Sequence, residues 1–316
     1  MVRLVAISLG LATALLSSSA RAQALADGPP PATRLVNRGI AALRYNPLGL
    51  FYEGRLSYRL RLYRDEGLAL RDNYAGGGAM VTLTPAFLRV GPYLEVAPAS
   101  FMTVWSTLQY SKYFGALGIL QSFSSPRADF SDDELDRRDE LPDEDPLASY
   151  SSSGLELTLG LDLQAKVGPV AVRSQSRLIR ADLDLRAGDT VFYDQTTDIL
   201  MPDSGFSLTS DLDAAYLAMG GRLVLGARYS AGVPFYDSSS YAPGEEEESD
   251  NVTHRVGPVV AYTFHSRDGA AFNQPTVLVL VQWWLDHRYR AGQESSQALP
   301  MIAVGFRFHG DLLAFD

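Results

Sequence analysis

The chain has no cysteine, and after its first 22 residues it has no long apolar run. Without cysteine, an exported protein must hold together without disulfide bonds or thiolate metal sites. Without a run of about 20 apolar residues, a helical inner-membrane protein is excluded. The chain also has no excess of positive charge, because it contains 27 Lys and Arg and 37 Asp and Glu. The basic surface that nucleic-acid binding requires is therefore absent.

Residues 1–22 have the pattern of a secretory signal peptide. Arg3 supplies the positive start, Leu4 to Leu16 is apolar, and Ala20-Arg21-Ala22 offers a cleavage site. Cleavage after Ala24 or Ala26 fits the same rule and stays open. An uncleaved anchor is the alternative, but the apolar run is short for a spanning helix. Loss of the two leader arginines would take the net charge from −10 to about −12.

Strict two-residue alternation is the main pattern of the remaining chain, and the segment from Leu155 to Val167 shows it most clearly. Leucines and Val167 occupy one face, whereas Glu156, Asp162 and Lys166 lie on the other. In a soluble sheet the leucine face would have to be covered by a second layer. In a membrane barrel it faces lipid, and the charged face lines the interior.

The alternation predicts an all-β fold, a transmembrane antiparallel up-and-down β-barrel of about ten strands. The expected strands lie near 50–64, 74–90, 94–110, 155–167, 170–185, 207–219, 222–233, 252–264, 276–289 and 298–308. If the first runs outward, the connections near 65–73, 115–152, 186–206, 234–251 and 290–297 lie outside. Those at 91–92, 168–169, 220–221 and 265–275 lie inside. Long outer loops and short inner turns are typical of such barrels.

Two features leave the strand count open at eight or twelve. The stretch from Thr190 to Met201 is the best candidate for an additional hairpin. Pro85 and Pro98 interrupt their strands, and each is expected to mark a bulge because proline cannot donate to the ladder.

The predicted organisation is one domain with short extensions. Residues 1–22 form the signal peptide, 23–49 a periplasmic tether, 50–309 the barrel and 310–316 a tail. Within the tether, 34–44 is read as a plain linker, with a surface helix or a plug in the barrel as alternatives. Acidic residues concentrate in the outer loops near 115–152, 186–206 and 234–251.

The signal peptide, the alternating segments and the aromatic-rich end from Ile302 to Phe308 resemble those of bacterial outer-membrane β-barrel proteins. The resemblance covers about 50–308 and is architectural. It implies residence in a Gram-negative outer membrane, among outer-membrane lipid and lipopolysaccharide. Chains of this class commonly end on an aromatic residue of the last strand that the barrel-assembly machinery recognises. This chain departs from that pattern, because eight residues follow Phe308 and Phe315 is only penultimate.

A secreted β-sandwich or a lipocalin-like barrel would also show alternation, but with a polar outer face. Here the face expected outside is aliphatic. Several aromatic residues near strand ends suit the girdles at membrane interfaces, namely Tyr110, Tyr262, Phe264, Trp283, Tyr289, Phe306 and Phe308.

The expected lumen is rich in arginine and carboxylate. The residues predicted to line it are Arg55, Arg59, Arg61, Arg173, Arg177, Arg228, Glu156, Asp162, Asp211, Asp213 and Asp286. Arg89, Arg255, Arg307, Glu53 and Glu95 have the same parity. An arginine-lined path would favour anions, whereas complete pairing would plug the barrel.

The sequence contains no clear pattern of catalytic or metal-binding residues. Omptin proteases are similar in size and strand count and use an Asp–His pair, but adjacent Asp286 and His287 point to opposite faces of a strand. A lipid-cleaving enzyme would need a serine beside an outward histidine, for which His254 and His287 have the right parity. The acidic runs 132–134 and 245–248 lack a calcium-loop spacing and are read as solvated loops. No catalytic, cofactor or metal site is predicted.

Three functions follow from these observations. The first is a non-enzymatic barrel, structural or forming a narrow channel for small solutes. The second is a surface adhesin or binding protein acting through its acidic loops. The third is an outer-membrane hydrolase.

Overall fold

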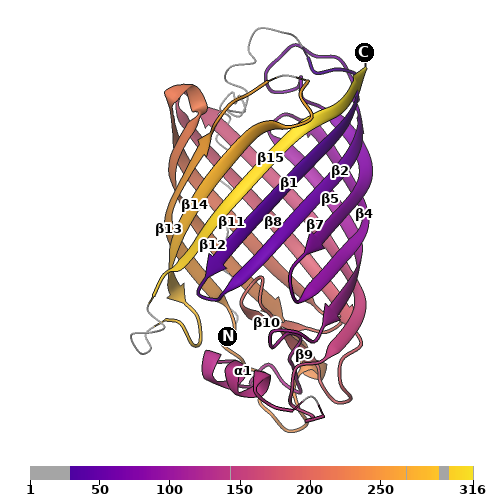
Figure 1. Cartoon of the computed structure of the whole chain (residues 1–316), viewed down its shortest axis with the longest axis vertical. Helices are drawn as coiled ribbons and strands as arrows, with labels where there is room; N and C mark the ends of the chain where they lie inside the picture. The colour runs from indigo at the N-terminus through magenta and orange to yellow at the C-terminus, as the bar shows by residue number, and fades with distance from the viewer. Residues whose placement is uncertain (1–28, 143, 268, 292–298, 316) are drawn as a thin grey trace.

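The computed structural model describes residues 29–142, 144–267, 269–291 and 299–315. Its main body is a closed antiparallel barrel (Figure 1), in which twelve strands follow one another in up-and-down order. They are β1 (Thr33–Tyr45), β2 (Gly49–Leu60), β3 (Tyr74–Leu83), β4 (Phe87–Ala99), β5 (Met102–Phe114), β7 (Ser151–Val167), β8 (Val170–Leu183), β11 (Phe206–Ala218), β12 (Leu223–Phe235), β13 (Thr253–Thr263), β14 (Asn273–Asp286) and β15 (Met301–Phe315). The signal peptide assigned to 1–22 lies outside the described residues.

Alternation along the strands places apolar side chains outside and polar ones inside. On the outer wall, Leu43 is 55 % exposed, Leu94 61 % and Val167 60 %. On the inner wall of β4 and β7, Arg89, Glu95 and Glu156 are buried. An apolar exterior around a polar interior is the arrangement of barrels that span a membrane.

The tether predicted over 23–49 is wrong for most of its length, because β1 is a barrel strand within it. β1 pairs with β2 on one side and with β15 on the other, from Thr33 opposite Phe315 to Tyr45 opposite Ile302. The apolar and basic stretch 34–44 had suggested a plain linker, with a surface helix or a plug in the barrel as alternatives. The strand forms because closing the sheet satisfies backbone groups that a free edge would leave unpaired.

The second missing strand comes from 74–110, where three strands replace the predicted two. The turn expected at 91–92 lies inside β4, and the chain instead reverses at Pro85 and after Ala99. At Gly91 a Cβ atom would lie 1.9 Å from the Leu108 carbonyl oxygen of β5. That glycine therefore serves close strand packing and not a turn. The irregularity expected at Pro98 is present as a register shift between Val96 and Ala99.

Two further predictions about the ends of the barrel are wrong. The connection 61–73 lies at the end opposite the long loops, because β1 reverses the direction assigned to the following strand. Residues 310–315 are not a tail, since they continue β15 to Phe315. Both ends of the barrel chain consequently meet at one rim, which is the upper rim in Figure 1.

The long connections form a folded cap at the other rim, the lower one in Figure 1. It contains helix α1 (Asp132–Asp139) and a small sheet of β6 (Ser122–Phe123), β9 (Val191–Asp194) and β10 (Ile199–Pro202). The 3-10 turn η3 (Ser238–Ser240) belongs to the same end, and η2 (Met219–Gly221) connects β11 to β12 at the opposite end. The hairpin expected within 190–201 therefore exists, but outside the barrel wall.

Candidate functional site: an arginine-rich lumen beneath a folded cap

The first ion-pair cluster of the lumen joins β2 to β4. Arg59 donates two hydrogen bonds to Glu95, from Nε to Oε1 at 2.6 Å and from Nη2 to Oε2 at 2.9 Å. Ser57 and Tyr93 donate to the same carboxylate at 2.6 and 3.1 Å. Such bidentate pairs are strong and directional, so this part of the wall is rigid and its charge is balanced.

A second cluster connects the wall to the cap. Arg89 of β4 lies 3.0 Å from Glu156 of β7 and donates to the Tyr113 hydroxyl at 2.8 Å. The same guanidinium is 3.3 Å from Asp194, the last residue of β9. The base of the β9–β10 hairpin is thereby fixed to the inner wall of the barrel.

The third cluster lies across the barrel on β8, β11 and β12. Asp213 accepts from Arg173 at 2.9 Å and from Arg228 at 2.6 Å. Its neighbour on the same face, Asp211, accepts from Ser230 at 2.6 Å. Asp211 also lies 3.9 Å from Arg228, so two arginines and two carboxylates balance one another in this cluster.

Four other lumen arginines form no hydrogen bond and no ion pair within 4 Å with any carboxylate in the described part of the chain. They are Arg38, Arg177, Arg255 and Arg307. Arg255 instead lies over the Trp284 ring at 5.0 Å and beside the Met301 sulfur. Arg38 and Arg307 are exposed although their strand parity turns them inward, so solvent-accessible space reaches them inside the barrel. The open part of the lumen is therefore cationic.

The cap has an apolar core of its own. Phe123, Phe130 and Leu200 pack together with less than 5 % of their surface exposed. Tyr289, predicted for a membrane girdle, packs instead against Phe130 with ring centroids 4.9 Å apart. The stretch 132–134 was predicted to be a solvated loop. Asp132 and Asp133 are indeed exposed, but 132–134 is not a loop, because it forms the first turn of α1.

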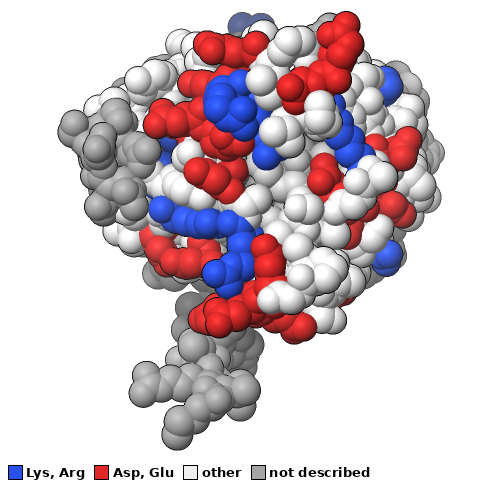
Figure 2. Space-filling model, turned by 90° about the horizontal axis from the view of Figure 1, so that it is seen from below, with Lys and Arg blue, Asp and Glu red and all other residues white. Residues whose placement is uncertain are grey.

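The β9–β10 hairpin lies across the mouth of the barrel. All eight residues of its two strands are buried. Ile199 and Phe192 pack in a cluster with Phe87 and Tyr113 of the wall. At the hairpin tip, the Thr196 carbonyl accepts from Arg44 of β1 at 2.9 Å. The hairpin also contacts β11 and β12, across the barrel from β4 and β5, and therefore covers much of this end. Figure 2 shows the outer face of the cap as a continuous surface of mixed charges.

One buried arginine joins four connections of the cap. Arg290, after β14, donates to Asp198 at the hairpin tip at 2.7 Å and to Asp132 of α1 at 2.6 Å. It also donates to the Asn46 side chain between β1 and β2 at 2.8 Å. The side chain of Arg290 is 4 % exposed and that of Asp198 is 1 % exposed. We call Arg290, Asp198, Asp132 and His287 the latch.

The last member of the latch, His287, is fixed as a neutral imidazole. Its Nδ1 accepts the backbone N–H groups of Tyr289 and Arg290, both at 3.1 Å, so Nε2 carries the proton and faces the Asp198 carbonyl at 3.2 Å. Burial lowers the pKa of His287, against the opposing charge of Asp198. Burial would raise the pKa of Asp198, but the charge of Arg290 and the hydrogen bonds from Arg290 and Tyr193 hold it below its usual range.

The structure separates the residues that the sequence grouped together. Arg55, Arg59, Arg173, Arg177, Arg228, Glu156, Asp162, Asp211 and Asp213 lie on the inner face of the wall. Arg61 lies just beyond β2 at the rim, where it donates to the Pro30 carbonyl. Asp286 does not line the lumen: a register shift places it opposite outward-facing His254, and it is exposed.

Sequence reasoning missed two groups of residues. Arg34, Arg38 and Arg44 were overlooked because their segment was assigned to the tether, although all three share one parity. The latch was overlooked because its members come from three connections that are far apart in the sequence, and no local pattern links them. His287 does not face outward as its strand parity suggested, because β14 ends at Asp286.

No arrangement of acids and histidines converges for catalysis among these residues. Asp286 is exposed, whereas His287 is buried in the latch, so the two do not act together. His254 lies 2.6 Å from the Tyr229 hydroxyl. In the described ranges no three His, Asp or Glu residues gather as metal ligands. The same ranges contain no helix long and apolar enough to cross a membrane.

Closed topology, an apolar exterior and a charged interior define this chain as an outer-membrane type of β-barrel. No family model matches it, and no curated protein does. Among solved structures it is similar to the β domain of the Bordetella autotransporter Brka, with 12 % identity and a TM-score of 0.42 over 88 % of this chain and 99 % of that one. It is also similar to the KdgM porin, with 10 % identity and a TM-score of 0.35 over 86 % and 98 % of the two chains. These similarities concern the fold, and no functional residue is transferred.

Proposed function

We propose that this protein is an outer-membrane channel for small anions, and that its cap restricts passage through the outer mouth. The observation that carries the proposal is the set of lumen arginines that no carboxylate binds directly, by hydrogen bond or by ion pair within 4 Å: Arg38, Arg177, Arg255 and Arg307. Two of them, Arg38 and Arg307, contact solvent-accessible space.

Charge inside a narrow protein wall acts strongly on ions because the wall has a low dielectric constant and focuses the field. Rings of arginine select anions in pores for this reason. The negative charges of Glu95, Glu156 and Asp213 do not cancel the attraction for anions, because each of these carboxylates is already paired with an arginine.

Barrel size leaves room for such a path. Side chains just fill a barrel of about eight strands, whereas this one has twelve. The path is restricted at the cap, where the hairpin lies across the mouth. We therefore expect a small conductance while the latch is closed and a larger one when the cap is loosened.

The orientation of the channel in the membrane follows from the lengths of its connections. Long connections lie outside the cell in barrels of this type, so the cap faces outward and both chain ends face the periplasm. We propose that the leader over 1–22 exports the chain and that the barrel-assembly machinery inserts it among lipid and lipopolysaccharide.

Planar-bilayer recording of the refolded full-length protein tests this function. Under a salt gradient the reversal potential should show anion preference. The double variant Arg38→Glu and Arg307→Glu should move that potential toward cation preference, because it reverses two charges in the open part of the lumen. Arg180→Glu is the matched control, since Arg180 is exposed on the outer wall over the Phe206 ring.

A selectivity that the double variant leaves unchanged would refute the proposal. Absence of current in the wild type and also in a variant with a loosened cap, Arg290→Ala, would refute it as well. Heat-modifiable gel mobility verifies that each variant is a folded barrel.

A further inference from the structure

Neighbouring strands on one side of the barrel are apolar on both of their faces. The chain is apolar without alternation through 214–218 of β11, 223–226 of β12, 259–262 of β13 and 277–281 of β14. Residues of one parity face lipid and are exposed, namely Tyr216, Leu225, Val260 and Val279. The other parity forms an inner surface, the apolar wall, made of Leu217, Val224, Val259, Ala261, Leu278 and Leu280. The interior of such barrels is usually polar, so a water-filled lumen alone does not account for this wall.

Strand pairing makes the apolar wall one surface. Leu217 lies opposite Val224, Val224 opposite Ala261, and Ala261 opposite Leu278. Side chains that lie directly opposite in a sheet are neighbours, so the surface continues across all four strands. Because the barrel is closed, a second copy of the chain cannot reach this surface, whereas a small molecule inside the lumen can.

The open part of the lumen lies along the apolar wall. Ala261 is 8 % and Leu280 7 % exposed, and the other four residues of the wall are half-buried. Across the barrel, β3, β4 and β5 lie opposite β12, β13 and β14. There Met80, Tyr93 and Trp105 form a buried cluster that fills the inner face. Solvent-accessible space therefore meets hydrocarbon on one side of the lumen.

Positive charge borders the apolar wall. Arg307 of β15 is a diagonal neighbour of Leu278 and is exposed inside the barrel. Its charge interacts across the lumen with those of Arg173 and Arg228, which already hydrogen-bond to Asp213. Like charges repel, so an anion beside Arg307 would relieve repulsion among three guanidinium groups.

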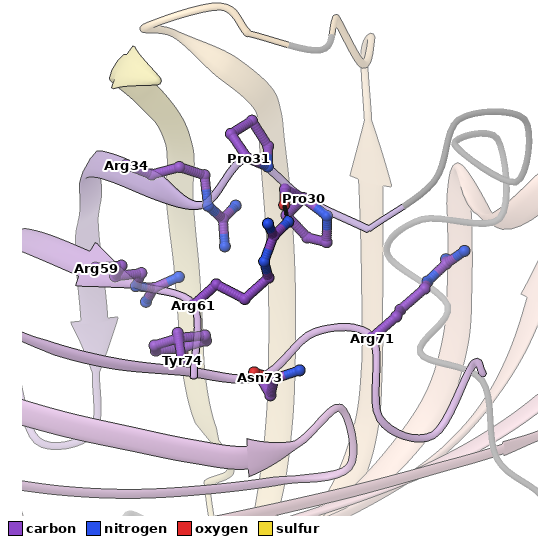
Figure 3. Close-up of a pocket in the computed structure, with 8 residues that line it drawn as sticks. All are labelled: Pro30, Pro31, Arg34, Arg59, Arg61, Arg71, Asn73 and Tyr74. Atoms are coloured by element: carbon purple, nitrogen blue, oxygen red, sulfur yellow. Dashed lines mark hydrogen bonds between the residues drawn. The ribbon is translucent and has the colours of Figure 1, made fainter. Parts of the chain in front are cut away.

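The arginines at the periplasmic rim are used differently (Figure 3). Arg59 is paired with Glu95, and Arg61 donates to the Pro30 carbonyl at 2.7 Å. Arg71 points away from both of them. These side chains do not converge on a common place, which leaves the border of the apolar wall as the site where accessible positive charge and hydrocarbon meet.

We propose that the lumen binds an organic anion with an apolar body, whose hydrocarbon part lies on the apolar wall and whose acidic group faces Arg307. The proposal names the substrate class of the channel and rests on that function for its biological role. Sites for organic molecules typically combine an apolar lining with a few polar groups that fix the orientation of the ligand. A guanidinium fork matches the paired oxygens of a carboxylate or a phosphate. An inorganic anion would gain nothing from the wall.

Isothermal titration of the folded full-length protein in detergent, at low ionic strength, tests the proposal with three related probes. Hexanoate has the charge and the chain, acetate the charge alone and hexanamide the chain alone. We expect hexanoate to bind about tenfold or more tightly than acetate, because its additional methylene groups leave water. It should exceed hexanamide by about tenfold as well, because only the carboxylate pairs with a guanidinium. Titration into detergent alone subtracts partitioning into micelles.

The wild-type protein by itself can overturn the proposal. Equal affinities for hexanoate and acetate would show that the apolar wall takes no part in binding. Equal affinities for hexanoate and hexanamide would show the same for the arginine. Absence of hexanoate binding overturns the proposal as well. Binding that appears only when residues 23–28 are removed would assign the wall to the start of the chain, and would also overturn it.

Two matched pairs of substitutions on the same two strands locate the site. Val259→Thr with Leu278→Thr makes the wall polar and should weaken hexanoate binding about fivefold or more, with little change for acetate. Val260→Thr with Val279→Thr alters the lipid-facing side and should leave both affinities within about twofold. Equal effects of the two pairs would place hexanoate outside the lumen and refute the proposal. Heat-modifiable mobility verifies the fold of each variant.

The outcome is separable from that of the channel. Hexanoate binding that depends on the apolar wall, in a barrel without anion preference, would retain the site and reject the proposed function. Anion preference with equal affinity for acetate and hexanoate would retain the channel and reject the site.

Discussion

The two ends of this barrel are built from the same sheet but use arginine in opposite ways. At the capped end, Arg290 is buried between Asp198 and Asp132, and its charge holds four connections together. At the other end, Arg61 donates to the neutral Pro30 carbonyl, and Arg71 forms no ion pair with any residue that the structure describes. Arginine bound between carboxylates holds the cap together, whereas the loop 61–73 is held by hydrogen bonds of the neutral Asn73 side chain. The length of the connections contributes to this difference, because the long ones build an apolar core beside which the ion pairs are buried.

The largest expected effect is the loss of the latch. Arg290→Ala leaves the buried carboxylate of Asp198 unpaired, which typically costs about 3–5 kcal/mol. We expect hydrogen exchange of the β9–β10 hairpin to accelerate strongly and channel conductance to rise, while the barrel strands stay protected. Equal acceleration in β4 and β8 would mean that the cap and the barrel unfold as one unit, and that the two ends are not independent.

A smaller effect is expected at the opposite rim from Asn73→Ala. This substitution leaves the N–H groups of Leu62 and Tyr63 and two carbonyls without their partner, which typically costs about 1–3 kcal/mol. Protease cleavage within 61–73 should increase, with no change in cap protection. Unchanged cleavage would show that the loop is held by other contacts.

Acidification should loosen the cap modestly. The pKa of His287 is lowered by burial from its ordinary value of 6.5, so the folded cap favours the neutral ring. When folding lowers the pKa of a group, that group contributes fully to the stability of the fold at pH values above its unfolded-state pKa. The contribution is lost as the pH falls below the unfolded-state pKa, because the unfolded chain then binds the proton more readily. The pKa of Asp198 is also lowered, so it acts with the same sign but only below about pH 4. Hairpin exchange and conductance should therefore increase between about pH 6.5 and 5.

The control for this pH dependence is His287→Asn. An asparagine oxygen can accept from the same backbone groups as Nδ1 but does not titrate in this range. A pH response of equal size in that variant would assign the effect to another group.

The smallest effect is expected at the surface of the cap. Arg137 lies on the exposed side of α1 and pairs with Glu134 at 2.7 Å, with half of its side chain exposed. The same residue type in the same cap should be dispensable there, because exposed ion pairs add little to stability. Arg137→Ala should therefore match the wild type in hairpin exchange and conductance, which makes it the reference for Arg290→Ala.

The sequence predicted the barrel well because alternation is a local property that each strand carries by itself. The leucine face of 155–167 and the charged face opposite to it appear in the structure as the outer and inner walls. The strand count was less accessible. Gly91-Pro92 resembles a turn in sequence, but the backbone of β5 passes too close for a Cβ atom there. The first strand was missed because its pairing partner, β15, lies at the other end of the chain.

For the residues of the lumen, the sequence likewise predicted the face of the wall on which each lies, but not the residues with which each pairs. The inner-face position of Arg55, Arg173 and Asp213 followed from parity. Which of these arginines is neutralised did not, since Arg173 and Arg228 meet Asp213 only across three strands. Asp286 was misplaced because a register shift against β13 breaks its parity.

The sequence alone therefore determined the two faces of the wall, the charge of the interior and the end at which the long connections lie, because strand geometry translates each residue's position into a face. The tertiary structure alone decided which arginines keep a free charge, how the hairpin closes the mouth and what holds it there. Those features depend on residues far apart in the chain, such as Asn46, Asp132, Asp198 and Arg290, that become neighbours only when the sheet closes.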